Sequence, residues 1–495
     1  MPVEALPGRP GTLTPEQEAK LHQFWQVTLK VFGVYGGNGG YRFNSINGVE
    51  VGENNGEADM TSSDIQQKQE ADSRSLEKKK KKKSFFSRKR PQKDSETQTA
   101  SATSDATSNA STFISPTVEE NDKYGQTKEF QQALASQTPE DLRAVFWNMV
   151  KHDHPDGLLL RFLRARKWDV ERALVMLVST MHWRGQDMHV DDDVIKAGEG
   201  GALEATKSPD IEVKKEAEDF LAQLRIGKSY LHGLDKHDRP ICVIKVRLHR
   251  QGEQSERSLE RYTVYLIETA RMLLAPPVDT AALLFDMTNF SLANMDYAPV
   301  KFMIKCFEAN YPESLGIVVV HKAPWIFQGI WTIIRGWLDP VVAAKVHFTR
   351  SLEELEEFIP RDHIAKELGG DEDWSYNYAE PYPDENVRMS DEAAKRTLFV
   401  EREEIVKEFE TITMKWIAPS TGIDERADTL AKRNELAESL RKNYWQLDPY
   451  IRARTIYDRI GVITDGGKIK PYPGESIMEK NPALIGHETS PDDVD

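Results

Sequence analysis

The segment from Tyr311 to Val346 constrains the fold of this chain more than any other part of the sequence. It opens with Tyr311-Pro312-Glu313 and continues with Ile317–Val320, a short run of mostly β-branched apolar residues. Such a run is typical of a strand that is buried on both faces of a sheet. The next apolar segment, Ile326–Trp337, has Arg335 as its only charged residue. We therefore expect a buried strand, followed by a helix that is buried or faces lipid.

This helix is too short to cross a bilayer, which takes about 20 apolar residues. It is followed by Leu338-Asp339-Pro340 and then by Lys345. A second notable motif lies upstream, at 160–169, and reads Leu-Arg-Phe-Leu-Arg-Ala-Arg-Lys-Trp-Asp. The segment between the two motifs alternates apolar runs of strand length with helical patterns, which predicts a largely parallel sheet with helical crossovers.

The two motifs, taken in this order, resemble the CRAL-TRIO lipid-binding domain in the subgroup of fungal phosphatidylinositol-transfer proteins. The resemblance covers residues 138–386. It implies an α/β fold with a helical N-terminal domain and a mostly parallel sheet, to which this chain adds N- and C-terminal helices. In that family the strand floors a lipid cavity and the apolar helix is its gate. The gate-helix residues implied here are Phe327, Ile330, Trp331 and Ile334.

The resemblance also implies a headgroup site for phosphatidylinositol. Arg166 and Lys167 match a cationic pair that lies where the inositol phosphate binds, and a guanidinium next to an ammonium suits a phosphodiester. Glu313 matches the residue that accepts hydrogen bonds from inositol hydroxyls, and Lys345 matches the partner of the phosphate. A solvated helix face is the alternative explanation of the cations at 161–167.

Two further positions bear on a second ligand. Ser291 falls, in a loosely similar stretch, where the family contacts the phosphocholine of a competing lipid. Val342 stands where phosphoinositide-binding members often carry a threonine, so this chain lacks one hydroxyl donor. A sterol or a polyisoprenoid is therefore an alternative second ligand.

Hydrophobic periodicity divides the chain into six segments. Residues 1–35 carry an amphipathic helix that starts at Thr14, and its apolar stripe predicts packing on the helical domain or, alternatively, insertion into a membrane. The other predicted segments are a disordered insert at 36–126, a helical domain at 127–190, a charged helical connector at 191–228, the lipid-binding domain at 229–386 and a C-terminal helical extension at 387–495.

The predicted insert contains a basic run with aromatic residues, Lys78–Pro91. Basic residues near an anionic leaflet contribute on the order of 1 kcal/mol each, and buried aromatic rings add to this. We therefore predict membrane contact through Lys81, Phe85, Phe86 and Arg88. A nuclear import signal and a solvated tail without a specific role are the alternatives.

Composition and motifs argue against other classes of function. The net charge of −15 disfavours nucleic-acid binding, and Cys242 and Cys306 are predicted to be buried free thiols. Asp286 ends a predicted strand, but the sequence lacks a nucleophile elbow, a phosphate-binding glycine loop and clustered metal ligands. Residues 1–12 have no secretory signal pattern.

We therefore expect a non-catalytic, cytosolic and monomeric protein without cofactor or metal, peripherally associated with internal membranes. Its expected function is to bind phosphatidylinositol and a second lipid and to exchange them between membranes. The alternative is a lipid-regulated scaffold or sensor that recruits partners.

Overall fold

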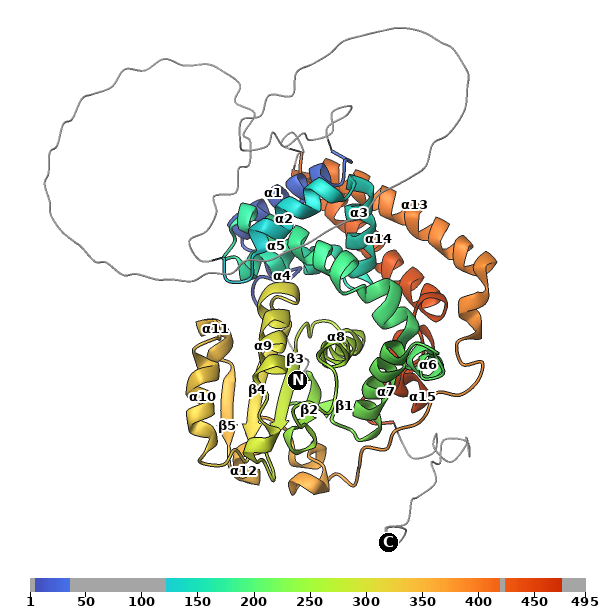
Figure 1. Ribbon diagram of the computed structural model, residues 1–495. Coiled ribbons are helices and arrows are strands. Elements are labelled where there is room, and N and C mark those ends of the chain that lie inside the picture. Colours follow the sequence, from blue (N-terminus) through green and yellow to red (C-terminus); the bar gives the residue numbers. More distant parts are fainter. Residues whose placement is uncertain (1–4, 36–121, 419–422, 474–495) are drawn as a thin grey trace, which may run out of the picture. The chain divides into compact units, whose positions relative to one another are not determined.

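The computed structural model describes residues 5–35, 122–418 and 423–473. Figure 1 shows a group of helices and, beside it, a β-sheet with its own helices. Helices from both ends of the chain make up the group: α1 (Pro15–Val31), α2 (Gln126–Ser136), α3 (Pro139–Val150), α4 (Pro155–Ala165), α5 (Val170–His182), α13 (Glu392–Trp416) and α14 (Ile423–Ile451).

Within the described residues, five strands form the main sheet in the order β1-β2-β3-β4-β5. β1 pairs antiparallel with β2, and the three remaining pairings are parallel. This confirms the predicted fold class. The elements are β1 (Ser229–Leu234), β2 (Pro240–Lys245), β3 (Ala281–Asp286), β4 (Leu315–His321) and β5 (Val346–Thr349), with the crossover helices α8 (Glu256–Met272), α9 (Tyr297–Lys305) and α10 (Phe327–Arg335).

Alternate side chains of the central strands face different surroundings. Leu284 and Val319 point to the side that is closed by Leu355 and Ile359. Their neighbours in the same strands, Leu283, Val318 and Val320, point to the side of α8 and α10, where a second cluster of apolar residues lies. Because successive side chains of a strand point to opposite faces, the continuous apolar run of β4 buries both sides of the sheet, as predicted.

The amphipathic helix α1 belongs to the protein core. The Thr14 hydroxyl accepts a hydrogen bond from Gln17 N and forms the expected capping box. Trp25 is fully buried, and its Nε1 donates to Asp156 Oδ1 at 2.7 Å. The stripe is therefore the inner face of a helix that packs on the helical domain, and both α13 and α14 contribute residues to the same core.

Further helices and strands connect and complete these layers. They are α6 (Ile195–Ala205), α7 (Ile211–Arg225), α11 (Pro340–Ala343), α12 (Leu352–Leu355), α15 (Ile456–Arg459), β6 (Ile463–Thr464) and β7 (Lys468–Ile469).

Local caps set two helix starts, and one boundary differs from the sequence expectation. Helix α9 begins at Tyr297 because the Asp296 carboxylate caps it, and Thr455 starts α15 with a capping box of its own. Residues 122–126 are folded and do not belong to an insert: Tyr124 donates a 2.7 Å hydrogen bond to Glu308, which fixes this part of the chain.

Candidate lipid site

An apolar cavity of about 220 Å³ lies between the sheet and helices α8, α9 and α10. A second cavity of about 80 Å³ adjoins it, and Leu283, Met303 and Leu315 line both. Aliphatic and aromatic side chains dominate the lining, which suits hydrocarbon more than a polar ligand. The strands contribute Ile244, Leu283, Phe285, Val318, Val320 and Val346 to the larger cavity.

One face of α10 closes the larger cavity. Phe327, Ile330 and Ile334 are buried, and Trp331 is half-buried. The opposite face is exposed: Ile333 is 47% exposed, against 7% for Ile330. The two faces of α10 therefore differ in their exposure to solvent, although apolar residues cover most of the circumference of the helix. Of the four predicted gate residues, Phe327, Trp331 and Ile334 line the cavity, and Ile330 is buried in the apolar cluster beside them.

The surface next to α10 carries further exposed apolar side chains. Trp325, which precedes α10, is 83% exposed, and Ile326, Val341 and Phe348 are also exposed. Large apolar side chains that are exposed together are candidates for contact with a partner or a membrane.

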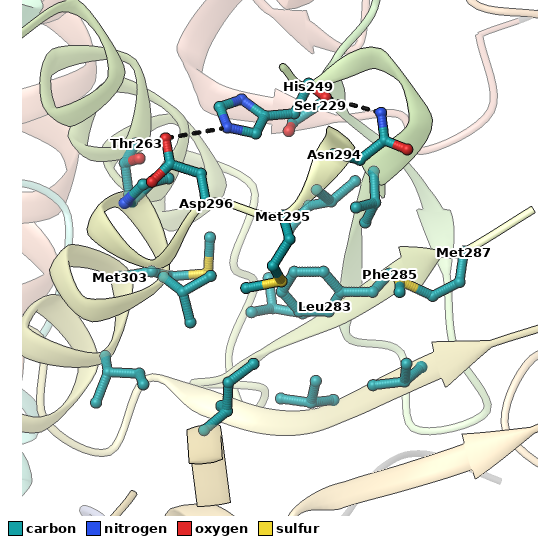
Figure 2. Close-up of a pocket in the computed structure, with 18 of the residues that line it drawn as sticks. Ser229, His249, Thr263, Leu283, Phe285, Met287, Asn294, Met295, Asp296 and Met303 are labelled. Carbon is teal, nitrogen blue, oxygen red and sulfur yellow. Dashed lines mark hydrogen bonds and ion pairs between the residues drawn. The ribbon is translucent and has the colours of Figure 1, made fainter. Parts of the chain in front are cut away.

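Polar side chains gather along one side of the larger cavity, as Figure 2 shows. His249 Nε2 lies 3.4 Å from Asp296 Oδ2, and Lys228 Nζ donates to His249 Nδ1 at 3.3 Å. Burial lowers the pKa of Lys228 to about 8. Asn294 Nδ2 donates to the main-chain oxygen of His249 at 2.9 Å. These side chains are held by one another, so they form a fixed polar border of the apolar space.

Flexible side chains fill the space opposite this border. Figure 2 shows the thioethers of Met287, Met295 and Met303 around Leu283 and Phe285. Methionine has several rotatable bonds and a polarizable sulfur, so it adapts to ligands of different shape. The lining is therefore suited to more than one kind of hydrocarbon chain.

A cationic cluster adjoins the smaller cavity at the amino-terminal ends of β3 and β4. Lys345 Nζ donates to the main-chain oxygen of Leu315 at 2.7 Å. Burial lowers the pKa of Lys345, the charge of Glu313 opposes this effect, and the charges of Arg9 and Arg164 add to it. Lys345 and Glu313 therefore lie together, beside a wall of the cavity.

Helix α4 presents two further arginines to this cluster. Arg161 Nη1 donates to the main-chain oxygen of Glu313 at 2.8 Å, and its Nη2 donates to that of Asp279 at 2.5 Å. Arg164 Nη2 donates to Asp279 Oδ2 at 3.2 Å. Burial and the neighbouring charge of Arg9 lower the pKa of Arg164 to about 10. Such a cluster of guanidinium and ammonium groups is suited to bind a phosphate.

Comparison with known proteins identifies the family. Residues 126–179 match the N-terminal CRAL/TRIO domain, and residues 224–370 match the CRAL/TRIO domain. The chain is 38% identical over 473 residues to phosphatidylinositol transfer protein CSR1 of Eremothecium gossypii, which covers 94% of this chain and 100% of that protein. The chain belongs to the CRAL-TRIO family.

A second relative and one solved structure are also similar. A CRAL-TRIO domain-containing protein of Schizosaccharomyces pombe is 50% identical over 325 residues, which is 66% of this chain and 69% of that protein. The structure titled "Crystal structure of Sfh5" aligns with 15% identity and a TM-score of 0.35, over 51% of this chain and 81% of that one. The sequence resemblance to CRAL-TRIO proteins is thus confirmed by relatives that span most of the chain.

The remaining predicted headgroup residues of this CRAL-TRIO protein are Arg166, Lys167 and Ser291, and the contacts described for Arg166 and Ser291 differ from those of Lys345. Arg166 Nη2 donates to Gln126 Oε1 at 2.6 Å, and Lys167 is exposed, with a φ of 52°. Ser291 is exposed and donates from Oγ to Asn294 Oδ1 at 2.9 Å. Ser291 thus caps a surface turn and lies outside the lining of the larger cavity.

Sequence reasoning assigned no role to Asp279 or Arg9, and it treated Arg161 and Arg164 as candidates for a solvated face. A local signal for the two α4 arginines was present: positions three apart lie on the same face of a helix. No local pattern pointed to Arg9, whose proximity depends on a contact across 270 positions. Val342 lines the larger cavity, where its side chain is apolar.

The remaining predicted residues have structural roles or lie elsewhere. Asp286 is buried, pairs with Arg247 and accepts a hydrogen bond from Thr288 N at 3.0 Å, so it fixes the turn after β3. Cys242 and Cys306 are buried free thiols, as predicted. Lys81, Phe85, Phe86 and Arg88 lie outside the described residues.

No group of histidine, cysteine and carboxylate side chains in residues 5–35, 122–418 and 423–473 is arranged to hold a metal ion. Nor does any helix in that part of the chain have the length and hydrophobicity needed to cross a membrane.

Proposed function

We propose that this protein binds phosphatidylinositol with its acyl chains in the cavity behind α10 and exchanges the lipid between membranes without catalysing a reaction. The hydrogen bond from Lys345 Nζ to the main-chain oxygen of Leu315 carries the proposal. Leu315 lines both cavities, so this cation lies next to the apolar space. An amphiphile with an anionic headgroup fits this arrangement.

The smaller cavity supports the same assignment. Ala281 and Ser314 line it; Ala281 lies two positions after Asp279, and Ser314 directly follows Glu313. Acyl chains in the two cavities would therefore leave the phosphodiester near the cationic cluster. The Eremothecium gossypii relative is itself a phosphatidylinositol transfer protein by name.

Energetics favour exchange over permanent capture. Burial of an acyl chain is worth about 0.8 kcal/mol per CH₂ group, whether the chain is in a bilayer or in an apolar cavity. The cavity therefore needs only to match the bilayer for a lipid to move in either direction. Opening of α10 next to a membrane provides the path, and the exposed Trp325 and Phe348 beside α10 supply an apolar surface for transient peripheral contact.

Transfer of labelled lipid between vesicles by the purified protein tests this function. The double variant Lys345→Ala, Lys167→Ala should lose phosphatidylinositol transfer and keep its fold and phosphatidylcholine transfer. The variant Lys407→Ala, Lys442→Ala, in which both replaced lysines are exposed on α13 and α14, is the charge-matched control and should transfer like the natural protein.

Each measurement has an outcome that would contradict part of the proposal. Normal phosphatidylinositol transfer by the Lys345→Ala, Lys167→Ala variant would show that these residues are not the headgroup site. Stable binding of lipid by the natural protein without measurable transfer would favour a lipid-regulated scaffold. Mass spectrometry of lipids that copurify with the protein identifies the second ligand.

A further inference from the structure

A turn that precedes α1 contributes a guanidinium to the cationic cluster. Arg9 donates from Nε to Asp279 Oδ2 at 3.1 Å and from Nη2 to Asp279 Oδ1 at 3.3 Å. Arg164 donates to the main-chain oxygen of Gly8 at 2.8 Å and to Asp279 Oδ2 at 3.2 Å. Hydrogen bonds thus hold this turn, residues 6–12, against Asp279 and Arg164, which border the proposed headgroup site.

The turn is well ordered by its own hydrogen bonds. The Thr12 hydroxyl donates to the main-chain oxygen of Leu6 at 2.8 Å and accepts from Arg9 N at 3.0 Å. Arg9 Nη1 donates to the main-chain oxygen of Pro7 at 3.0 Å. Gly8 is buried with a φ of 76°, a conformation that glycine adopts without strain. The Arg9 side chain is therefore held in place before any ligand binds.

The cluster has more positive charge than its own carboxylates balance. Four cationic side chains face two carboxylates, which leaves an excess of two positive charges: Arg9, Arg161, Arg164 and Lys345 against Asp279 and Glu313. Unbalanced charge in a partly buried site is unfavourable, so an anion that enters the site is stabilised.

Arg164 has an unused donor in this site. Its side chain is 9% exposed, and its Nε is buried without a hydrogen-bond partner in the described part of the chain. Buried donors without a partner are rare in proteins, because each one costs free energy. An acceptor oxygen supplied by a ligand removes this cost.

We propose that Arg9 is a headgroup-binding residue, and that a phosphate group of the lipid replaces the Asp279 carboxylate on Arg9 and Arg164. The guanidinium fork of arginine binds carboxylate and phosphate oxygens with the same bidentate geometry. Asp279 thus acts as an internal anion that occupies the site until lipid arrives. The inference rests on the proposed function for the identity of the lipid, and the phosphate chemistry itself does not depend on it.

Arg9→Ala tests the contribution of the turn. In vesicle assays we expect phosphatidylinositol transfer to fall about tenfold or more, since charge-assisted hydrogen bonds are worth at least this factor in affinity. Phosphatidylcholine transfer and the melting temperature should stay unchanged. Arg441→Ala removes the same charge from an exposed pair on α14 and should have no effect on either lipid.

Asp279→Asn distinguishes a ligand-binding role of Arg9 from a purely structural role of its ion pair with Asp279. If Asp279 competes with phosphate, this variant frees both guanidinium groups, and phosphatidylinositol transfer should stay at the natural rate or rise. If the ion pair only fastens the turn, Arg9→Ala and Asp279→Asn should lower the transfer of both lipids and the melting temperature alike. That common loss overturns the inference.

Calorimetry with inorganic phosphate distinguishes a lipid headgroup site from a site for free phosphate. Weaker phosphate binding by Arg9→Ala, together with no phosphatidylinositol transfer by the natural protein, supports the anion site and contradicts the proposed function. Unchanged phosphate binding and unchanged phosphatidylinositol transfer in Arg9→Ala overturn the inference and leave the proposed function intact.

Discussion

Asp156 accepts hydrogen bonds from Arg433 at 2.8 and 2.6 Å, although the two residues are 277 positions apart in the sequence. Asp156 lies in the first turn of α4, and Arg433 is fully buried on α14. Trp25 of α1 donates to the same carboxylate. One buried charge thus joins the helical domain to both ends of the chain.

Replacement of Asp156 by asparagine should destabilise the protein strongly. Removal of one partner from a buried ion pair leaves the other charge uncompensated, which costs about 3–5 kcal/mol. Urea denaturation measures the change in the free energy of unfolding. Glu438→Gln removes the exposed partner of Arg441 and serves as the control, with an expected change within about 1 kcal/mol. Equal effects of the two variants would contradict the structural role of Asp156.

Ile330→Asp should prevent lipid loading because Ile330 is buried on the same face of α10 as Phe327 and Ile334, which line the cavity. Ile333→Asp is the matched control, since this residue lies on the same helix and is 47% exposed. The measurement is the amount of copurified lipid per protein, together with the melting temperature. Lost loading at unchanged stability indicates a gate, whereas an unfolded Ile330→Asp protein indicates that α10 is a plain core helix.

The free energy of unfolding should depend on pH in the alkaline range because Lys228 is buried. Burial lowers the pKa of Lys228 to about 8, whereas an unfolded lysine titrates near about 10.4. Between these pH values the unfolded chain binds more protons than the folded protein, so the contribution of Lys228 to the free energy of unfolding rises with pH, by about 3 kcal/mol in total. Below about pH 8 the cost of its buried charge is fully present.

Lys228→Met isolates this effect. The difference in unfolding free energy between Lys228→Met and the natural protein should change by about 3 kcal/mol from neutral pH to about pH 10, in favour of the natural protein at the higher pH. Urea denaturation of both proteins at the two pH values provides the measurement. A constant difference would mean that Lys228 titrates normally in the folded protein.

Deletion of Lys78–Arg90 should slow lipid transfer on anionic vesicles and leave it unchanged on neutral ones. Exposed charges are screened within about 10 Å at 0.1 M salt, so the contribution of this segment should fall as salt rises. Phosphate on Ser84 or Ser87 adds about −1.5 to −2 charges and should weaken the contact. Phe85 and Phe86 should supply a salt-resistant part.

The deletion has two informative alternatives. Equal transfer on both vesicle types, at the rates of the intact protein, would make the segment a solvated tail. Nuclear accumulation that depends on the same residues would favour an import signal.

Local patterns in the sequence determined the buried strand at Ile317–Val320, the helix start at Thr14 and, through the resemblance of two motifs, the family of this protein. The apolar run of β4 and the capping box at Thr14 act over a few neighbouring positions, so they are visible in one dimension. The motif that ends at Lys345 predicts a phosphate contact for this residue; the structure shows its hydrogen bond to Leu315 at the cavity wall, and the phosphate contact stays a prediction. Such patterns do not show which face of α10 closes the cavity, because apolar residues occur on both of its faces.

Only the tertiary structure decided which charges come together. Arg9, Arg164 and Asp279 lie on three separate segments, and their ion pairs depend on how α1 and α4 pack against the start of β3. The same is true of Asp156 and Arg433. Chain folding brings such groups within a few ångströms and removes them from water, and both effects depend on packing across hundreds of positions, which periodicity and spacing do not encode.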